Sequence, residues 1–273
     1  MEKNEKRHVK RKSKVKGPSY KIINEDIEDV KVPQKKRQKK EKKGKETSFE
    51  ITDEDKPGCS HQLEIGYHVK KITEPSIVIL DLETTGLICG GIIPHITQIA
   101  AMEYSSKKRF SKYICPELSI SPIAEMLTGI SWNGEALLHR GNPVECVGIK
   151  TALNDFMTWL QKFHDVTIVA HNGRRFDFKV LSTAVHNCRL SDIFNSSLTG
   201  FCDSLDIFRY KYPQLKKHNQ AYLADHFGAG SYNAHNAVDD VETLNIILRN
   251  ACVTISDFME HSDDVECWEN ENM

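Results

Sequence analysis

Apolar and polar positions alternate with two different periods between residues 75 and 252. Short apolar runs predict buried strands, and stretches in which apolar residues recur every three or four positions predict amphipathic helices. Strands are expected near residues 77–82, 95–104, 108–115 and 166–170, and helices near 119–127, 150–163, 174–187, 219–227 and 236–250. Three consecutive strands followed by alternating helices and strands indicate an α/β fold in which helices flank a mixed β-sheet.

The first expected strand ends in two acidic residues. Residues 77–80 form an apolar run rich in β-branched side chains, which is typical of a central strand covered on both faces. Asp81 and Glu83 lie two positions apart and therefore share one face of the strand. Two buried carboxylates repel each other, and a divalent cation between them removes this penalty. The alternative is that both side chains lie in a solvated turn just beyond the strand.

A further acidic residue occupies the apolar face of an expected helix. The strand at residues 166–170 is followed by a turn at residues 171–173 and then by the helix. At about 100° per residue, Asp177 lies in the middle of the apolar stripe of that helix. An unpaired aspartate that faces a core is rare, so a role as a metal ligand is favoured over a surface position.

The last expected helix begins near Asn236 and contains two adjacent aspartates on different faces. Asp240 lies within the apolar stripe, whereas Asp239 lies about 100° further round and is expected in solvent, where an acid in the first turn suits the helix dipole. His235 precedes Asp240 by five residues, so both side chains face one site only if His235 lies in the loop or cap before the helix. The alternative for His235 is a capping or core role.

Three sequence segments together resemble the three motifs of the DEDDh exonucleases. They read IVILDLETTGL, VAHNGRRFDFKVL and AHNAVDDVETL, and the likeness covers about residues 75–252. This family of 3′-to-5′ nucleases includes the three-prime repair exonucleases, whose A-H-N-G…D-F run is most similar to residues 170–178, and the exonuclease-like domain of the long promyelocytic leukaemia protein isoform is also similar. Residues 127–131 resemble the T-G-I/L segment between the first two motifs. The resemblance implies a ribonuclease H-like architecture.

The resemblance also implies a site with two metal ions. Two Mg²⁺ or Mn²⁺ ions roughly 3.5 to 4 Å apart would clamp the scissile phosphate, and oxygen ligands favour these hard cations over zinc. The ligands would be Asp81, Glu83, Asp177 and Asp240. His235 would remove a proton from the attacking water at neutral pH.

Five further residues would bind substrate by the same resemblance. Thr84 would present its backbone to the terminal 3′-hydroxyl, and Leu87 would lie against the last base. His171, Arg175 and Phe176 would line the nucleotide pocket. A ring at Phe176 would stack a base for roughly 1 to 3 kcal/mol. The alternative for Phe176 is an ordinary core position at the edge of the apolar stripe.

The segments outside this region differ sharply in charge. Residues 1–50 contain 18 Lys and Arg against 9 Asp and Glu, and the remaining 223 residues contain 19 against 29. The basic runs KRHVKRKSKVK and KKRQKKEKKGK are expected to be disordered, within an arm and linker of residues 1–74. They resemble nuclear localisation signals and suit phosphate backbones; the alternative is a solubilising tail. After Val253 an acidic tail without evident structure is expected.

Cysteine spacing and hydropathy limit the compartments in which the protein is expected. The eight cysteines form no C-x-x-C pair and no zinc-ligand spacing, so reduced thiols in a reducing compartment are expected. The charged N-terminus argues against a signal peptide, and no apolar run has the roughly 18 residues that a membrane span needs. A nuclear protein is therefore expected, with the cytoplasm as a second compartment, and the localisation of a chain without residues 1–50 would test this.

These features together favour metal-dependent 3′-to-5′ hydrolysis of phosphodiester bonds at single-stranded or frayed 3′ ends of nucleic acid. DNA is slightly preferred over RNA as the expected substrate, although contact with a 2′-hydroxyl depends on pocket geometry. One alternative is an inactive exonuclease-fold module that acts as a nuclear scaffold. Another is a transposase- or integrase-type endonuclease, which shares the fold and the two-metal chemistry. No membrane partner is expected, and a homodimer stays open.

Overall fold

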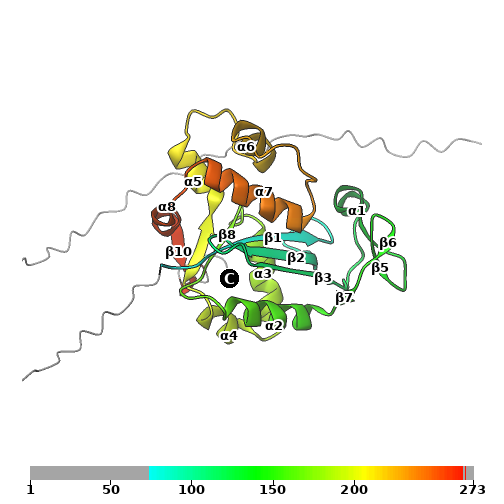
Figure 1. The fold of residues 1–273 in the computed structure, drawn as a ribbon. Coiled ribbons are helices and arrows are strands. Elements are labelled where there is room, and N and C mark those ends of the chain that lie inside the picture. Colours follow the sequence, from blue (N-terminus) through cyan, green and yellow to red (C-terminus); the bar gives the residue numbers. More distant parts are fainter. Residues whose placement is uncertain (1–73, 267, 269–273) are drawn as a thin grey trace, which may run out of the picture. The chain divides into compact units, whose positions relative to one another are not determined.

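A mixed β-sheet with helices on both faces forms the centre of the protein (Figure 1). The computed structural model describes residues 74–266 and residue 268. The predicted basic arm lies outside the described residues and stays a prediction. Within the described residues, no helix combines the length and the apolar character that a membrane crossing requires.

The large sheet has seven strands in the order β10-β9-β8-β1-β2-β3-β7. Strands β1, β2 and β3 are antiparallel neighbours, and β8 and β9 continue the sheet in parallel with β1. These strands are β1 (Ile77–Thr84), β2 (Ile96–Glu103), β3 (Arg109–Ile114), β7 (Cys146–Val147), β8 (Thr167–Ala170), β9 (Gly200–Asp203) and β10 (Ser262–Asp264). A separate three-stranded sheet contains β4 (Ile130–Trp132), β5 (Leu137–His139) and β6 (Asn142–Pro143).

Two helical layers cover the large sheet. One face carries α2 (Ile149–Leu160), α3 (Asp177–Asn187) and α4 (Ser191–Ser196), and the other carries α5 (Ser204–Lys211), α6 (Gln220–His226) and α7 (Ala237–Asn250) (Figure 1). The short helices α1 (Pro122–Thr128) and α8 (Ile255–Glu260) complete the fold. Each layer forms its own hydrophobic core against the sheet, so the sheet separates two cores.

Strand β1 shows how the sequence builds this arrangement. Its side chains alternate between the two cores: Val78, Leu80 and Leu82 belong to the core on the α3 side, and Ile77 and Ile79 to the core on the α7 side. All five are at most 5% exposed. The structure therefore confirms the predicted strand, whose side chains alternate between two covered faces.

The ribonuclease H-like mixed sheet and its main helices agree with the sequence prediction. The short elements were not expected, namely β4 to β7, α4, β9, α5, α8 and β10. None has more than eight residues, which is too short for an apolar period to stand out from a loop.

The prediction that no structure follows Val253 is wrong. Helix α8 begins with a capping box between Thr254 and Asp257, and β10 then pairs with β9. Phe258 is fully buried, and Trp268 is 3% exposed against Phe178, with ring centroids 5.4 Å apart. These two buried aromatic side chains thus attach the acidic segment to the domain. The acidic composition of the segment does not indicate this.

The expectation of reduced thiols is wrong for two of the cysteines. Cys115, just after β3, forms a disulfide with Cys146 of β7. The bond connects the two ends of the 31-residue excursion that contains α1 and the three-stranded sheet. Cys89, Cys188, Cys202 and Cys252 have free thiols.

The buried aromatic of α8 gives a stability prediction. We expect Phe258→Ala to lower the free energy of unfolding by about 3–5 kcal/mol, because it removes a fully buried ring and leaves a cavity. The matched variant Met259→Ala, in the same helix but 42% exposed, should change it by less than about 0.5 kcal/mol. Denaturant titration of the full chain measures both. Equal, small effects would mean that α8 does not contribute to the folded core.

Candidate active site

Strand β1 presents Asp81 and Glu83 on the face that α7 covers. They follow Ile77 and Ile79 in the alternation, so they point toward the same side as the second core. Glu83 is 7% exposed, and its pairing partner on β2 is Gln98. The predicted common face is present, and the alternative of a solvated turn does not describe these positions, because both lie inside the hydrogen-bonded strand.

Helix α7 contributes Asp240 from its first turn. The backbone N–H of Asn236 donates to Asp240 Oδ2 at 3.1 Å, and the Gln220 side-chain amide donates to Asp240 Oδ1 at 3.1 Å. The Tyr232 hydroxyl also hydrogen-bonds this carboxylate. The helix start is itself fixed by the Gln98 side chain, which accepts the N–H of Ala237 at 3.2 Å. Neutral groups therefore hold Asp240 and its helix at the site.

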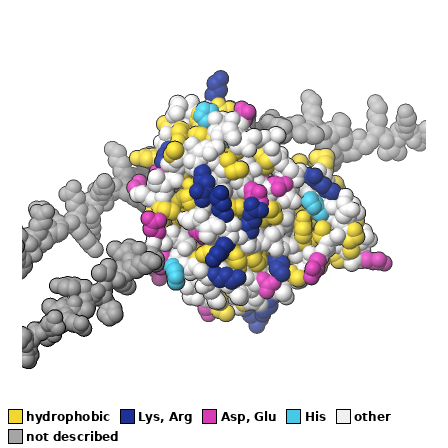
Figure 2. All heavy atoms as spheres, in the orientation of Figure 1, with side chains coloured by type: hydrophobic (Ala, Val, Ile, Leu, Met, Phe, Trp, Pro, Cys, Tyr) yellow, Lys and Arg dark blue, Asp and Glu magenta, His cyan; other side chains and the backbone are white. Residues whose placement is uncertain are grey.

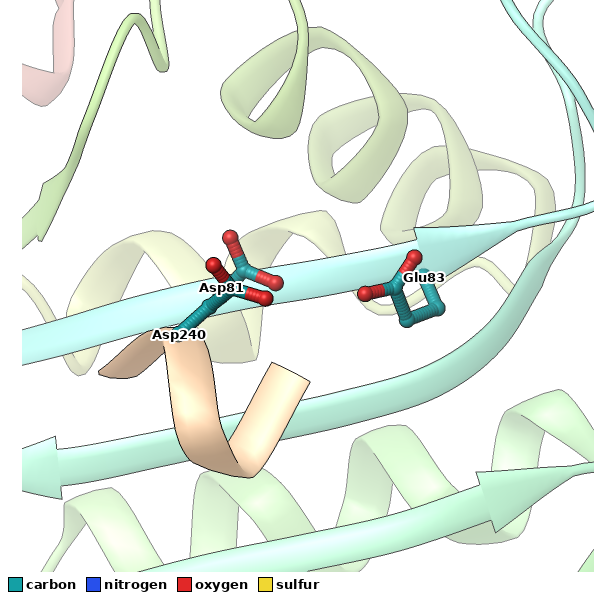
Figure 3. A group of neighbouring side chains, drawn as sticks. All are labelled: Asp81, Glu83 and Asp240. Carbon is teal, nitrogen blue, oxygen red and sulfur yellow. The ribbon is translucent and has the colours of Figure 1, made fainter. Parts of the chain in front are cut away.

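Asp81, Glu83 and Asp240 converge in space (Figure 3). One carboxylate oxygen from each lies within 4.8 Å of the others. Oxygens that share one divalent cation lie at most about 4 to 5 Å apart, because each is about 2.0 to 2.6 Å from the ion. The group therefore has the spacing and the all-oxygen chemistry of a hard-cation site.

Asp177 lies beside this group but is not one of its three members. It is the first residue of α3, is 7% exposed, and accepts a hydrogen bond from the backbone N–H of Leu82, between the two acids of β1. A helix N-terminus favours a negative charge at this position. Its charge still acts on Asp81 and Glu83, because it raises the pKa of both.

The site accumulates negative charge without a compensating cation. Burial, and then the charge of neighbouring acids, raises the pKa of Asp81 well above its usual range and that of Glu83 to about 8. Burial also raises the pKa of Asp177 to about 7 and increases that of Asp240. No Lys or Arg is among the described residues that line the surrounding cleft. A divalent cation fits this set of ligands, since it supplies the missing positive charge.

His235 lies in the loop directly before α7, where its spacing from Asp240 requires it. The side chain is exposed and lines the cleft, while its backbone N–H donates to Asp240. Its φ of 67° is left-handed, which is uncommon outside glycine. The helix cap is instead Asn236, whose side chain accepts the N–H of Val238 at 3.2 Å. His235 is therefore neither a helix cap nor a core residue.

Asp239 differs from its prediction. It is outside the acidic group, as the helical phase predicts, but it is partly buried and accepts a hydrogen bond from the Asn233 side chain at 3.0 Å. The loop before the helix folds back over this side chain, a contact that a helical wheel does not include.

The cleft has a volume of about 580 Å³, and four of the five predicted substrate residues line it. They are Thr84, Leu87, His171 and Phe176, whereas the exposed Arg175 does not line it. Leu87 is 79% exposed, which suits contact with a ligand. Phe176 is partly buried against the core as well, so its alternative role as a core residue is also visible.

His171 is held by the protein on both ring nitrogens. Nδ1 lies 2.9 Å from the Ser204 hydroxyl, and Nε2 lies 2.7 Å from the backbone carbonyl of His218. Burial lowers the pKa of His171 to about 4, so the ring is neutral at physiological pH. Its ring therefore shapes the cleft wall and has no nitrogen left for a substrate hydrogen bond.

Helix α1 forms an apolar wall of the cleft. Ile123 is 64% exposed and Leu127 is 46% exposed, and both line the cleft together with Leu87. The sequence indicates this exposed apolar surface. Apolar residues follow the Ser-Pro start of the helix, but they do not recur at the spacing that would place them all on one buried face.

Sequence reasoning missed the residues that hold the site in place. Asp203, 2% exposed, accepts the backbone N–H groups of Asn172 and Arg174 at 2.8 and 3.1 Å and so fixes the turn before Asp177. Gln98 and Gln220 act in the same way on α7. In the sequence, a polar residue next to an apolar run is the signal for such a supporting role. The hydrogen-bond partners of these residues lie 20 to 139 positions away, so no local pattern identifies them.

Residues 78–248 match the exonuclease family of RNase T type. This match covers more than half of the chain, so the protein belongs to that exonuclease family, and its three acidic motifs are those of the DEDDh group.

Relatives and solved structures agree with this assignment. DNA polymerase III of PolC type is 27% identical over 180 residues in Halalkalibacterium halodurans and 29% identical over 175 residues in Clostridium perfringens. These matches cover 65% and 63% of this chain but only 11% of each relative. The crystal structure of E. coli Exonuclease I with a dT13 oligonucleotide matches with a TM-score of 0.54 at 18% identity, over 67% of this chain and 42% of that one, and shows the same fold.

The raised pKa of Glu83 gives a pH prediction for the metal-free protein. Its pKa rises from 4.5 to about 8 on folding, so between these values the folded state binds more protons than the unfolded state. Glu83 therefore lowers the free energy of unfolding by an increasing amount as pH rises from about 4.5 to 8. We expect Glu83→Gln to raise the unfolding midpoint more at pH 8 than at pH 5, in thermal denaturation with chelator present.

The exposed Glu135 provides the control for this experiment. Glu135→Gln also removes one negative charge but lies outside the cleft, so its effect on the unfolding midpoint should not increase with pH. A Glu83→Gln effect that is equal at both pH values would show that burial does not oppose ionisation at this site.

Proposed function

We propose that the protein is a 3′-to-5′ exonuclease that hydrolyses phosphodiester bonds at single-stranded or frayed 3′ ends. The observation that carries the proposal is the convergence of buried and half-buried acids from β1, α3 and α7 on one cleft, which no Lys or Arg of the described residues lines. Such a site excludes the phosphate backbone of a nucleic acid unless cations are present. Membership of the exonuclease family supplies the reaction class.

Four carboxylates would hold two Mg²⁺ or Mn²⁺ ions, namely those of Asp81, Glu83, Asp177 and Asp240. Bound ions would supply Lewis-acid stabilisation of the charge that develops on the scissile phosphate. The protein orients Asp177 by the N–H group of Leu82, and Asp240 by the N–H group of Asn236 and the side chains of Gln220 and Tyr232. Neutral donors fix the ligand geometry and leave the negative charge available to cations.

His235 would accept the proton of the attacking water. Its imidazole is exposed at the cleft and next to Asp240, and imidazole is the side chain best suited to proton transfer near neutral pH. The backbone N–H of His235 donates to Asp240, so the proposed base lies directly beside a proposed metal ligand.

The terminal nucleotide would lie between the acids and the apolar wall. Leu87, Ile123 and Leu127 present exposed apolar surface that a base could contact without sequence discrimination. Thr84 would face the 3′-hydroxyl and Phe176 the base. Arg175, which is exposed outside the cleft, would reach a phosphate further along the strand. DNA is slightly favoured over RNA, because the E. coli Exonuclease I structure contains an oligothymidylate.

Positive charge outside the cleft is suited to the rest of a strand. Lys107 and Lys108 are exposed at the turn between β2 and β3. Figure 2 shows that Lys and Arg side chains gather over the middle of the face that it presents. Such charges would attract the phosphate backbone without reading its sequence.

The proposal is tested with single strands that carry a label at the 3′ or the 5′ end, as DNA and as RNA. We expect stepwise release of nucleotides from the 3′ end that needs added Mg²⁺ or Mn²⁺ and stops with chelator. Asp240→Asn should lower turnover more than about 100-fold, beyond the 10- to 100-fold that supporting residues account for. Asp239→Asn should lower it at most about fivefold, because an amide oxygen can still accept from Asn233.

Three outcomes would contradict the proposal. Full turnover in excess chelator would reject the metal site, and release from the 5′ end would reject the direction. Binding of the strand without any turnover by the wild-type protein would favour an inactive scaffold.

The general-base role of His235 gives a separate prediction. We expect His235→Ala to lower the single-turnover rate by about 10² to 10⁴ with little change in strand affinity, because proton transfer is lost and binding is retained. His186→Ala, an exposed histidine near the end of α3, is the matched control and should retain the wild-type rate. An undiminished rate in His235→Ala would leave the attacking water without a protein base.

A further inference from the structure

The loop that carries His235 has little structure of its own. It spans residues 227–236 between α6 and α7 and contains no helix or strand. Gly228 and Gly230 have left-handed φ values of 68° and 80°, and His235 adopts a φ of 67°. A non-glycine residue in this region persists only where its surroundings impose it. Contacts from outside the loop must therefore fix His235.

One such contact comes from the three-stranded sheet. Strands β5 and β6 are joined by Arg140 and Gly141, both left-handed with φ values of 52° and 79°, as a two-residue hairpin turn requires. The turn directs the Arg140 side chain to Asn233, whose side-chain oxygen accepts a hydrogen bond from Nη2. Asn233 in turn donates to Asp239 Oδ2 at 3.0 Å.

Arg140 is itself fixed to the end of α1, the helix that forms the apolar wall of the cleft. Its backbone N–H donates to the carbonyl of Gly129 at 2.7 Å, and Gly129 ends α1 in the left-handed region with a φ of 69°. A Cβ atom at Gly129 would lie 2.9 Å from Arg140 Cγ, so the arginine stem passes directly over the glycine. Gly129 thus allows Arg140 to extend from the α1 wall to the His235 loop.

A second connection reaches the same loop from β3. The Tyr113 hydroxyl lies 3.1 Å from Nδ1 of His139, the residue before Arg140, and also hydrogen-bonds the side chain of Asn236. Asn236 is the residue after His235 and the cap of α7. The loop is therefore held before His235 by Arg140 of the hairpin and after it by Tyr113 of β3, which also contacts the hairpin.

We propose that Arg140 is a positioning residue for His235, acting through Asn233 and Asp239 to keep the His235 loop in its left-handed, cleft-facing conformation. This inference rests on the proposed function of His235 as general base. Arg140 is exposed and does not line the cleft, so it acts on the reaction through the loop and not through the scissile phosphate.

A double-mutant cycle tests the proposal. We expect Arg140→Ala to lower the single-turnover rate on a 3′-labelled DNA strand about tenfold, with the strand dissociation constant unchanged. In the His235→Ala background the same substitution should change the residual rate less than about twofold, because the group that it positions is absent. Asn233→Ala should reproduce the effect of Arg140→Ala without altering the hairpin, and the two combined should equal either one.

Arg109→Ala is the matched control. Arg109 of β3 also links a strand to α7, through an ion pair of 2.5 Å with Glu242, a residue outside the His235 loop. It should retain the wild-type rate. Multiplicative effects of Arg140→Ala and His235→Ala would overturn the proposal, and so would a loss carried by strand affinity alone, which would make Arg140 a phosphate contact.

A second measurement does not depend on activity. Amide hydrogen exchange of residues 231–240 in the chelated protein should become faster in Arg140→Ala and Asn233→Ala than in the wild-type protein and Arg109→Ala, while exchange in β1 stays unchanged. Unchanged exchange in the loop overturns the positioning role. An inactive wild-type protein whose loop exchange responds as expected would instead contradict the proposed function and leave Arg140 as the residue that orders the loop.

Discussion

The burial of neighbouring carboxylates is the constraint on which the rest of this structure depends. Asp81, Glu83 and Asp240 place oxygens within 4.8 Å of one another, and Asp177 adds its charge from α3. Folding removes these carboxylates from water and brings them together, and the raised pKa values express first the burial and then the repulsion. Burial of apolar side chains in two cores, one on each face of the sheet, must outweigh the unfavourable energy of both. A stable scaffold is therefore a condition for the site.

The way in which the acids are held follows from the same constraint. A lysine or arginine beside them would relieve the repulsion, but it would also compete with a cation for the carboxylates. The protein uses neutral donors instead, among them the N–H group of Leu82 and the side chain of Gln220. Its arginines serve other connections, such as Arg174 with Asp206 and Arg109 with Glu242. The sign of the charge in the cleft is thus preserved by the choice of residues around it.

Local patterns predicted the parts of this structure that depend on neighbours in sequence. The alternation in β1 predicted both the central strand and the common face of Asp81 and Glu83, and the phase of α7 predicted that Asp240 rather than Asp239 joins the acids. Contacts between distant segments could not be predicted, because no local period encodes them. Asp203, Gln98 and Phe258 depend on partners far along the chain. The segment after Val253 was predicted to lack structure because its composition is acidic. That prediction is wrong, because Phe258 and Trp268 of this segment are buried.

The site combines elements of different rigidity. The acids lie on β1 and in the first turns of α3 and α7, where backbone hydrogen bonds and two cores fix them. His235 lies on a ten-residue loop with left-handed glycines, held by side-chain contacts from the β5–β6 hairpin. Local opening of such a loop requires less free energy than opening of a core element. Ligand geometry is therefore set by the fold itself, whereas the position of the proposed base depends on a few polar contacts that a bound strand, or a single substitution, can change.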